Sequence, residues 1–326
     1  MVSMNDNRGR RIDYLRISVT DRCNLRCRYC MPEEGTELFS HDEMLSLEEL
    51  VRVCRCAAKL GISRIKLTGG EPLVRKNVVW LAGQLRDIPG IEDITMTSNG
   101  ILLAEMAADL KRAGISCVNV SLDTLDAKRF AMITRRDSYE AVMRGIRSAK
   151  EAGLEVKINC AVMEDFQEPD VLDFAEFSIH NGIPVRFIEM MPIGQGRSFT
   201  ALDNDRLLEV LKRCYQDVVP VEKQMGNGPA VYYAFADGKG CVGFISAVHH
   251  RFCGQCNRVR LTSDGYLKLC LAHEDGVNLR DVIRSGAGDG QLKAVMAESI
   301  GRKPEGHLFG SGKREETCIN MNRIGG

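Results

Sequence analysis

The sequence predicts an α/β protein built on a parallel sheet, and two patterns indicate this fold class. Six strand-like runs alternate with helical patterns between residues 14 and 190, which is typical of right-handed βαβ crossovers. After residues 191–198 this alternation stops. Six units are fewer than the eight of a closed barrel, so we expect a partial, open barrel or a doubly wound sheet.

The helical patterns between the predicted strands carry start and stop signals. In the first, Ser46 is an N-cap, Glu49 follows it by three residues, and Gly61 ends the helix. The patterns at 102–114 and 139–153 end on glycine in the same way. The predicted strands are residues 14–19, 64–68, 93–98, 117–122, 155–162 and 185–190.

The C-terminal part of the chain has a different pattern. We therefore divide the chain into a barrel domain, residues 1–195, and a smaller α+β region, residues 196–326. Residues 286–314 are rich in Gly, Lys, Arg and Glu, and we expect them to be mobile in part. The predicted elements of this region are a helix at 203–216, β-like segments at 230–236 and 241–246, and a hairpin at 258–270 with its turn at Asp264-Gly265.

Composition excludes several function classes. The 326 residues include 44 basic and 44 acidic ones, and this neutral balance gives no general attraction to a nucleic acid polymer or an acidic membrane. No apolar run reaches the roughly 18 to 20 residues of a membrane span, and the N-terminus lacks the apolar core of a secretory signal. We expect a cytoplasmic protein that binds any anion through a local cluster of cations.

The thirteen cysteines are unusual for such a protein, because a reducing cytosol argues against a disulfide framework. Six of them form two tight groups, and we interpret the scattered ones as small buried apolar residues. The first group is Cys23, Cys27 and Cys30, and the second is Cys253, Cys256 and Cys270. The scattered ones are Cys54, Cys56, Cys117, Cys160, Cys214, Cys241 and Cys318.

In the first group, the spacing Cys-x3-Cys-x2-Cys lets one loop wrap around an iron–sulfur cluster, whose usual ligands are thiolates. A structural zinc site needs four ligands, and the nearest histidine, His41, lies eleven residues beyond Cys30. A [4Fe-4S] cluster held by three cysteines leaves one iron open. An open iron is a binding site for a further ligand.

The segment "CNLRCRYC", following the first predicted strand, resembles the signature of radical S-adenosylmethionine enzymes. The resemblance implies that the open iron chelates S-adenosylmethionine, which is cleaved reductively to methionine and a 5′-deoxyadenosyl radical. It also implies that Tyr29 contacts the adenine and that Gly70, Ser121 and Met191 contact the same ligand. All three follow predicted strands, and the sites of barrel proteins are built at the ends of their strands. Glycine at position 70 would let the backbone approach a ligand closely.

In the second group, the spacing Cys-x2-Cys-x13-Cys does not determine which metal the cysteines bind. His273 lies three residues beyond Cys270, and His249 and His250 lie just upstream of Cys253. Any of these histidines would complete a Cys3His zinc site. Spacing alone therefore favours neither zinc nor an iron–sulfur cluster.

A second resemblance covers nearly the whole chain. Together with the first motif and the closing "NMNRIGG", the segments "KLTGGEPLVR", "VNVSLDTLD", "RFIEMMPIG" and "FCGQCNRVRLTSDGYLKLCL" resemble the GTP 3′,8-cyclases of molybdenum cofactor biosynthesis. This implies a partial (β/α)6 barrel of the radical SAM type with a smaller C-terminal α+β region closing the barrel mouth. It also implies a second [4Fe-4S] cluster whose open iron binds the guanine of GTP, and 3′,8-cyclo-7,8-dihydro-GTP as the product.

The same resemblance assigns residues. Arg258 and Arg260 share the parity of one strand and so face one side. Lysine at position 66 differs from the arginine common in the family, and gives a point charge in place of a bidentate fork. The chain has no GxxxxGK[ST] loop, so GTP is expected as a substrate. The implied GTP contacts are Arg16, Lys66, Thr97, Lys157, Arg258 and Arg260, and the implied catalytic residues are Arg16, Arg258, Arg260, Gly325 and Gly326.

The resemblance further implies a reduced flavodoxin or ferredoxin-like electron donor, transfer of the product to cyclic pyranopterin monophosphate synthase, and a homodimer. Two alternatives remain open. One is a radical enzyme whose second group holds an auxiliary cluster and whose substrate is a peptide. The other is a binding protein in which zinc occupies both cysteine groups as a structural ion.

Overall fold

The computed structural model describes residues 3–222, 225–236, 238–309 and 320–325. All named strands belong to one twelve-stranded sheet, at whose centre β1 to β6 lie side by side in chain order and in parallel. These six are β1 (Tyr14–Ser18), β2 (Arg64–Thr68), β3 (Asp93–Ser98), β4 (Cys117–Ser121), β5 (Glu155–Val162) and β6 (Val185–Glu189). They match the six predicted strands.

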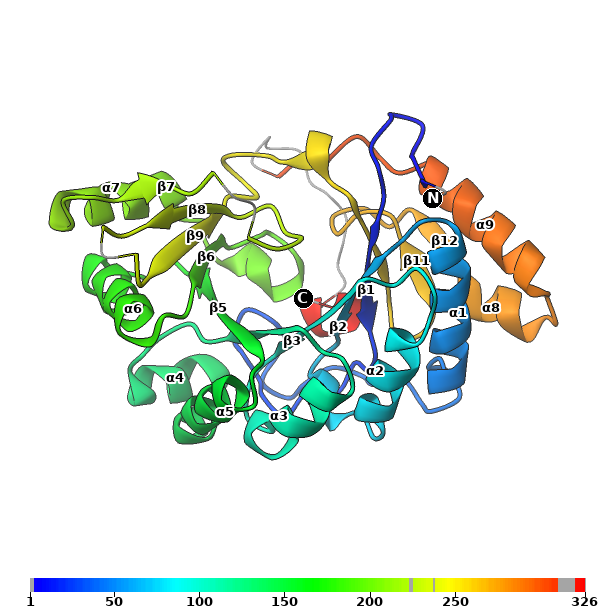
Figure 1. The fold of residues 1–326 in the computed structure, drawn as a ribbon, viewed down its shortest axis with the longest axis horizontal. Helices are drawn as coiled ribbons and strands as arrows, with labels where there is room; N and C mark the ends of the chain where they lie inside the picture. Colours follow the sequence, from blue (N-terminus) through cyan, green and yellow to red (C-terminus); the bar gives the residue numbers. More distant parts are fainter. Residues whose placement is uncertain (1–2, 223–224, 237, 310–319, 326) are drawn as a thin grey trace.

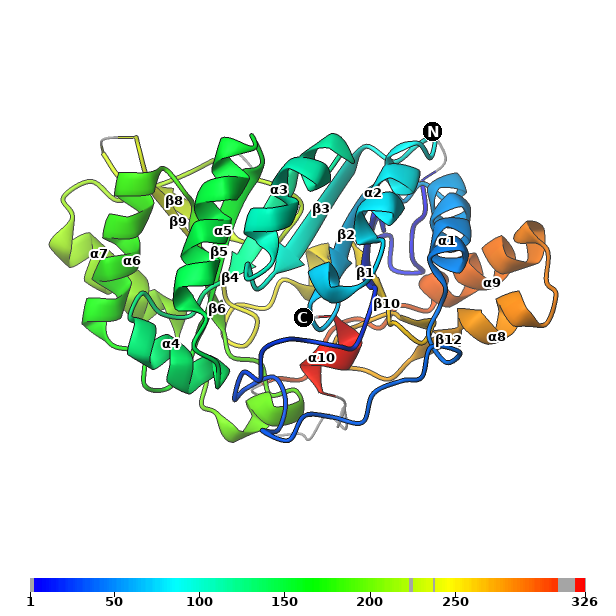
Figure 2. The ribbon, with the colours of Figure 1, turned by 90° about the horizontal axis from the view of Figure 1, so that it is seen from below.

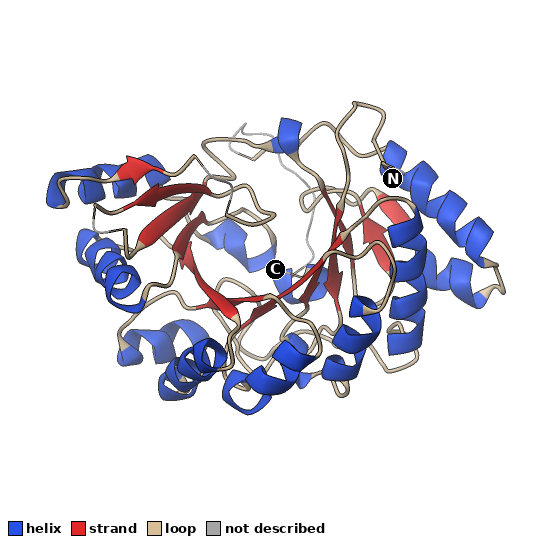
Figure 3. Ribbon diagram, in the orientation of Figure 1, coloured by secondary structure: helices blue, strands red, loops and turns tan. Residues whose placement is uncertain are grey.

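The sheet curves into an open arc with helices on its convex side and the C-terminus on its concave side (Figure 1). Figure 3 shows the same division, with most of the blue helices outside the red strands and short ones inside the arc near the C-terminus. The helices between the central strands are α1 (Leu47–Lys59), α2 (Val78–Arg86), α3 (Leu103–Arg112), α4 (Ala127–Thr134), α5 (Tyr139–Glu151) and α6 (Glu168–Asn181). The main apolar core lies between them and the sheet, where both layers exclude water from the strands.

Helix α1 shows why these elements form where they do. The Ser46 side chain accepts a hydrogen bond from the Glu49 backbone, and the Glu49 side chain accepts one from the Ser46 backbone. This capping box satisfies amide groups that the first helical turn leaves unpaired. Gly61, with φ +96°, follows the helix in a left-handed conformation that suits glycine. Both predicted signals are confirmed.

The C-terminal strands do not form a separate layer. Strand β10 pairs in parallel with β1, and β9 pairs in parallel with β6, so the C-terminal region extends both edges of the same sheet. This pairing joins residues far apart in the chain, which local sequence patterns do not specify. The strands are β7 (Val219–Pro220), β8 (Val231–Ala234), β9 (Cys241–Ile245), β10 (Arg258–Leu261), β11 (Tyr266–Lys268) and β12 (Gly276–Asn278).

The remaining helices are α7 (Asn204–Cys214), α8 (Leu279–Arg284), α9 (Asp289–Gly301) and α10 (Met321–Ile324). Helix α9 occupies much of the segment that we expected to be mobile in part. Leu292, Met296 and Ile300 recur at helical spacing, are buried, and join the main core, while α9 packs against α1. No helix in the described residues is long and apolar enough to cross a membrane.

The scattered cysteines agree with the prediction in part. Cys54, Cys56, Cys117 and Cys160 are buried, as expected. The prediction is wrong for Cys214, which is exposed at the end of α7, and it overstates the burial of Cys241. Cys318 lies outside the described residues.

Candidate active site

The first cysteine group lies in the loop after β1 and lines a cavity of about 200 Å³. Burial raises the pKa of Cys23 to about 11 and that of Cys30 to about 12, and it raises the pKa of Cys27 well above its ordinary value. Such thiols remain protonated at neutral pH unless a metal binds them, because a thiolate is costly in a dry site. Their burial therefore fits a metal-binding role better than a nucleophilic one.

Sulfur spacing bears on which metal group fits. Side chains that hold one metal ion bring their ligand atoms close together. Among the described residues, only two sets of His, Cys, Asp or Glu side chains have three ligand atoms within 4.8 Å of one another, and both sets contain Asp203. Neither cysteine group forms such a set. Thiolates on one tetrahedral zinc, each about 2.3 Å from the ion, lie roughly 3.8 Å apart. In neither cysteine group do all three sulfur atoms lie within 4.8 Å of one another, which is compatible with a cluster in which each thiolate binds a different iron.

Tyr29 and Asp123 join the cysteine loop to the end of β4. The Tyr29 hydroxyl donates to Asp123 Oδ2 at 2.8 Å, and the Ala161 backbone N–H donates to Asp123 Oδ1 at 2.8 Å. Burial raises the pKa of Asp123 to about 6, which its hydrogen bonds only partly offset. Tyr29 and Ser121 line the first cavity, as the resemblance implies, but the role of Asp123 was not predicted.

The glycines of "TGGEP" have a different use from the one expected. A Cβ on Gly70 would lie 2.4 Å from the Arg22 carbonyl oxygen, and the Gly70 N–H donates to the Thr20 carbonyl at 2.8 Å. Glycine is needed here because the backbone packs directly against the segment leading to Cys23. Gly70 also lines the first cavity, so close approach to a ligand is compatible with this packing.

Glu71 ties the ends of β2 and β3 together. Its carboxylate accepts from Ser98 Oγ at 2.8 Å and from the Asn99 backbone N–H at 2.6 Å. The Asn99 side chain donates to Asn24 Oδ1 at 2.7 Å, beside Cys23. Burial raises the pKa of Glu71 to about 7 despite these hydrogen bonds. The cysteine loop is thus held by polar contacts from two neighbouring strand ends.

The second cysteine group lines another cavity, of about 240 Å³, on the concave side of the sheet. Register explains how its cations meet. Arg260 of β10 pairs with Arg16 of β1, which pairs with Lys66 of β2, so inward-facing side chains lie in one row across three strands. Arg258 lines the same cavity, two residues before Arg260. Strand parity predicts the common face of Arg258 and Arg260, whereas their proximity to Arg16 and Lys66 depends on the pairing of β10 with β1 and of β1 with β2.

Charge is strongly unbalanced in this second cavity. Its lining contains seven cations but only two carboxylates, Asp93 and Glu155. Burial lowers the pKa of Lys66 and of Arg260, and neighbouring arginines lower both further. The cations are Arg16, Lys66, Lys157, Arg186, Arg258, Arg260 and Lys303. Buried like charges at this density are stabilised by a bound polyanion.

The same cations act on the second cysteine group. Burial alone would raise the pKa of Cys256, but Arg258 and Lys303 outweigh it and lower the pKa to about 7. This thiol is therefore ready to bind a metal as thiolate. His307 also lines the cavity, and burial, followed by the charges of Arg251 and His273, lowers its pKa to about 4.

The two cavities adjoin. Asn159, Ile188, Met191 and Met321 line both of them. The two cavities therefore share part of their walls. Met191 is the residue that the resemblance assigned to S-adenosylmethionine, and it lies at this junction.

One predicted GTP contact lines the first cavity and not the second. Thr97 lines the first cavity, while Thr95, the preceding residue of β3 on the same face, lines the second. Parity gives the face of a strand but not the position along it, so this difference was not predictable. Three further residues of the second cavity were missed: Asn119, Arg186 and Lys303. Arg186 had a signal, since it interrupts the apolar strand β6 at an inward-facing position.

The C-terminal tail enters the concave side of the sheet, where α10 lies beside the loop after β1 (Figure 2). Arg260 donates to the Gly325 carbonyl at 2.5 Å, and Asn322 donates to the Asp21 carbonyl at 3.0 Å. Gly325 has φ +70°, and a Cβ there would lie 2.5 Å from Thr68 Oγ1. The tail is packed as far as Gly325, and Gly326 lies outside the described residues.

Comparison with known proteins gives the class first. Residues 17–178 match the model of the Radical SAM superfamily, and residues 183–309 match the model described as Molybdenum Cofactor Synthesis C. The fold is similar to that of SuiB from Streptococcus suis bound to S-adenosylmethionine, with a TM-score of 0.62 and 16% identity over 87% of this chain and 68% of that chain. These matches define a radical SAM protein with a molybdenum-cofactor-type C-terminal region.

Curated relatives then give the family. A GTP 3′,8-cyclase of Clostridium perfringens is 42% identical over 99% of this chain and 100% of its own length. One of Moorella thermoacetica is 45% identical over the same shares. The chain belongs to the GTP 3′,8-cyclase family.

Proposed function

We propose that this protein is a radical S-adenosylmethionine lyase that converts GTP to 3′,8-cyclo-7,8-dihydro-GTP, the first step of molybdenum cofactor biosynthesis. One observation carries the assignment beyond family membership. Two adjoining cavities each contain one of the two groups of three cysteines, but among the described residues the first is lined by three carboxylates and the second by seven cations. S-adenosylmethionine has a positive sulfonium, and GTP has a polyanionic triphosphate, so the charges match one ligand to each cavity.

The first cavity fits a [4Fe-4S] cluster held by Cys23, Cys27 and Cys30, because the three thiols line one cavity and their sulfur atoms do not all lie within 4.8 Å of one another. Tyr29, Gly70, Ser121 and Met191 line this cavity and remain the proposed S-adenosylmethionine contacts. When bound, the cluster and S-adenosylmethionine would supply a 5′-deoxyadenosyl radical that takes the hydrogen atom from C3′ of the GTP ribose. The C3′ radical would add to C8 of the same guanine, and one further electron, from the donor, with a proton at N7 would complete the 7,8-dihydro product. The chain's contribution is to hold the two ligands and exclude water.

The second cavity fits a [4Fe-4S] cluster held by Cys253, Cys256 and Cys270, whose open iron would bind guanine. Around it, Arg16, Lys66, Lys157, Arg258 and Arg260 are the proposed contacts of GTP. Arg258 and Arg260 offer planar forks that suit bidentate phosphate binding, whereas Lys66 offers a point charge. Thr97 remains a proposed GTP contact, although it lines the first of the two adjoining cavities.

At the junction, Ile188, Met191 and Met321 present apolar side chains, which keep water away from the reacting carbon atoms. Arg260 has a second role there, because it binds the Gly325 carbonyl as well as facing the cavity. We propose that this contact makes the Gly325–Gly326 tail part of the catalytic site. Its function would be to position Arg260 and to close the space above the nucleotide.

The finer fold assignment is part of the proposal. We propose that β1 to β6 form a partial (β/α)6 barrel and that the C-terminal region closes its mouth. The chain would act in the cytoplasm as a homodimer, with a reduced flavodoxin or ferredoxin-like donor supplying electrons. Its product would pass to cyclic pyranopterin monophosphate synthase. The division at residue 195 also remains a proposal, since the two matched family models meet earlier, between residues 178 and 183.

The decisive test is anaerobic turnover of the iron-reconstituted protein with reductant, S-adenosylmethionine and GTP. Formation of 5′-deoxyadenosine and of a cyclised nucleotide in equal amounts is expected. If 5′-deoxyadenosine does not depend on GTP, or if GTP is recovered unchanged, the assignment is wrong. A peptide-modifying enzyme, the second candidate, has in its favour a likeness to SuiB bound to its precursor peptide, but at 14% identity that likeness concerns the fold alone.

A further inference from the structure

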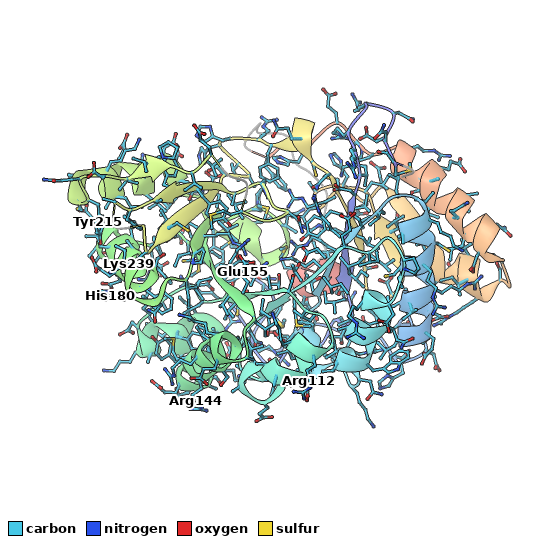
Figure 4. The ribbon with its side chains drawn as sticks, in the orientation of Figure 1. Arg112, Arg144, Glu155, His180, Tyr215 and Lys239 are labelled. Atoms are coloured by element: carbon cyan, nitrogen blue, oxygen red, sulfur yellow. The ribbon has the colours of Figure 1, made fainter. Side chains whose placement is uncertain are left out.

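Lys157 of β5 lies in the second cavity with its ammonium already occupied. Its Nζ donates to the Met225 carbonyl at 3.1 Å and pairs with Glu155 Oε1 at 2.8 Å, and its side chain is only 5% exposed. Burial by itself lowers the pKa of Lys157, but the hydrogen bond to Glu155 raises it above its ordinary value. The cation is therefore held by acceptors that belong to the protein. Glu155 is labelled in Figure 4, at the start of β5.

Met225 begins a short loop, residues 225–229, that separates two spaces. All five residues line the second cavity, and its last three, with Phe252 and Arg258, also line an outer hollow of about 570 Å³. The loop forms part of the wall between the nucleotide cavity and this hollow. Moving the loop would join the two spaces.

Two side chains tie the 225–229 loop to the sheet. Lys157 holds the Met225 carbonyl, and the Asn227 side chain donates to Asp93 Oδ2 at 2.6 Å. Gly226 has φ +103°, and a Cβ there would lie 3.3 Å from Lys157 Nζ, so the backbone rests closely on the ammonium. Both ties end on residues that line the second cavity.

A bound phosphate would compete for the same ammonium. Lysine has three N–H donors, and the Met225 carbonyl and Glu155 occupy two of them. A phosphate oxygen with full negative charge accepts more strongly than a neutral carbonyl, and its charge repels the Glu155 carboxylate. Lys157 thus cannot serve a phosphate fully while it keeps both of its present partners.

We propose that Glu155 and the Met225 carbonyl occupy Lys157 in place of a nucleotide phosphate, so that phosphate binding breaks both contacts and releases the 225–229 loop toward the outer hollow. The identity of the nucleotide rests on the function proposed above, but the competition itself requires only a polyphosphate. Glu155 then sets the affinity of the cavity, because it must be displaced at each binding event. Its return to Lys157 favours release of the bound anion.

The first test uses Glu155→Gln in the anaerobic protein carrying both clusters, with inorganic tripolyphosphate as the probe. Titration calorimetry should show a Kd about five-fold lower than in the wild type, since the variant loses a competitor for a part-buried cation. Glu151→Gln is the matched control, because Glu151 is exposed at the end of α5 and outside the cavity. An unchanged or higher Kd in Glu155→Gln overturns the proposal.

The second test measures the loop directly by hydrogen exchange of peptides that contain residues 225–229. Tripolyphosphate should speed exchange in the wild type, and Lys157→Met should show fast exchange without the probe and no further response to it. Asn227→Ala, which removes only the other tie, should exchange faster at rest but still respond. Slower exchange on adding tripolyphosphate, or a full response in Lys157→Met, contradicts the release of the loop.

The two proposals fail separately. If tripolyphosphate binds more tightly to Glu155→Gln while GTP is not cyclised, the assigned reaction is wrong and the competition stands. If GTP is cyclised normally and Glu155→Gln binds tripolyphosphate as the wild type does, the competition is wrong and the assigned reaction stands.

Discussion

The two cavities differ in charge far more than in size. Each holds one group of three cysteines, with Cys117 also lining the second, and their volumes are about 200 and 240 Å³. No lysine or arginine appears among the described residues that line the first, which contains Glu71, Asp123 and Glu189. Seven cations line the second. The cysteines alone therefore do not distinguish the two sites, and the ligand of each is decided by the residues that the sheet places around them.

The thiols respond to this difference. Burial raises the pKa of Cys30 to about 12 in the first cavity, while Arg258 and Lys303 outweigh burial and lower that of Cys256 to about 7 in the second. One site thus stabilises positive charge brought by a ligand, and the other stabilises negative charge. Substitutions that exchange these properties test the comparison.

The largest effect is expected from Cys27→Ser. Loss of one thiolate removes the first cluster, and cleavage of S-adenosylmethionine should fall to background. Production of 5′-deoxyadenosine measures this, with Cys54→Ser as a control because Cys54 is buried in the apolar core. If Cys27→Ser still produced substantial 5′-deoxyadenosine, the first cysteine group would not be required for cleavage of S-adenosylmethionine.

Cys256→Ser should instead damage the handling of GTP. We expect cyclisation to be lost while the first cluster, and with it reductive cleavage of S-adenosylmethionine, persists at a reduced rate. Iron content should fall by about half, because one of two four-iron clusters is missing. Normal GTP affinity in this variant would argue against a guanine site at the second cluster.

Arg260→Met keeps the volume of the side chain but removes its charge and its contact with Gly325. Loss of one partner from a buried charged contact costs about 3 kcal/mol, so kcat/KM for GTP should fall roughly 100-fold. Arg302→Met, at the exposed end of α9, is the matched control and should change little. A similar fall in both variants would point to general instability.

Asp123→Asn tests the first cavity in the opposite sense. The amide keeps an acceptor for the Tyr29 hydroxyl but removes a negative charge near the expected sulfonium. The Kd of S-adenosylmethionine should rise about ten-fold, equivalent to about 1.4 kcal/mol, with GTP affinity unchanged. Asp109→Asn on exposed α3 serves as the control. If GTP binding weakened instead, Asp123 would act on the ligand of the second cavity, and the assignment of one charged ligand to each cavity would be wrong.

The raised pKa of Asp123 also predicts that the stability of the wild-type protein depends on pH, and the same variant tests this. The pKa of Asp123 is about 6 in the folded protein, above its ordinary value, because burial favours the protonated form. Its stabilising contribution is therefore present below about pH 4 and lost as pH rises to about 6. In urea unfolding, Asp123→Asn should gain stability relative to the wild type across this interval. A relative loss as pH rises would contradict the assigned environment.

Local patterns predicted the parts of the site that one segment supplies. The Cys23–Cys30 loop follows from spacing, and the common face of Arg258 and Arg260 follows from strand parity. Cooperation between distant segments was not predictable. The pairing of β10 with β1, which brings Arg260 beside Arg16, depends on register between residues more than 200 positions apart.

Other omissions have physical reasons of their own. Arg186 interrupts an apolar strand but has no second cation beside it, and Lys303 follows Arg302 outside any predicted strand, so neither was recognised as part of a cation cluster. Asp123 gains its role only because Tyr29 is folded against it. Helix α9 was missed because its core-facing residues are few and glycines flank it, although Leu292, Met296 and Ile300 keep helical spacing.

The central claim is that the second cavity binds GTP at its own cluster. Electron paramagnetic resonance of the reduced protein with Cys23, Cys27 and Cys30 all changed to Ser isolates that cluster. About four irons per chain are expected, and addition of GTP should change the spectrum while ATP at the same concentration should not. A spectrum unaffected by saturating GTP, or zinc in place of iron, would contradict the claim.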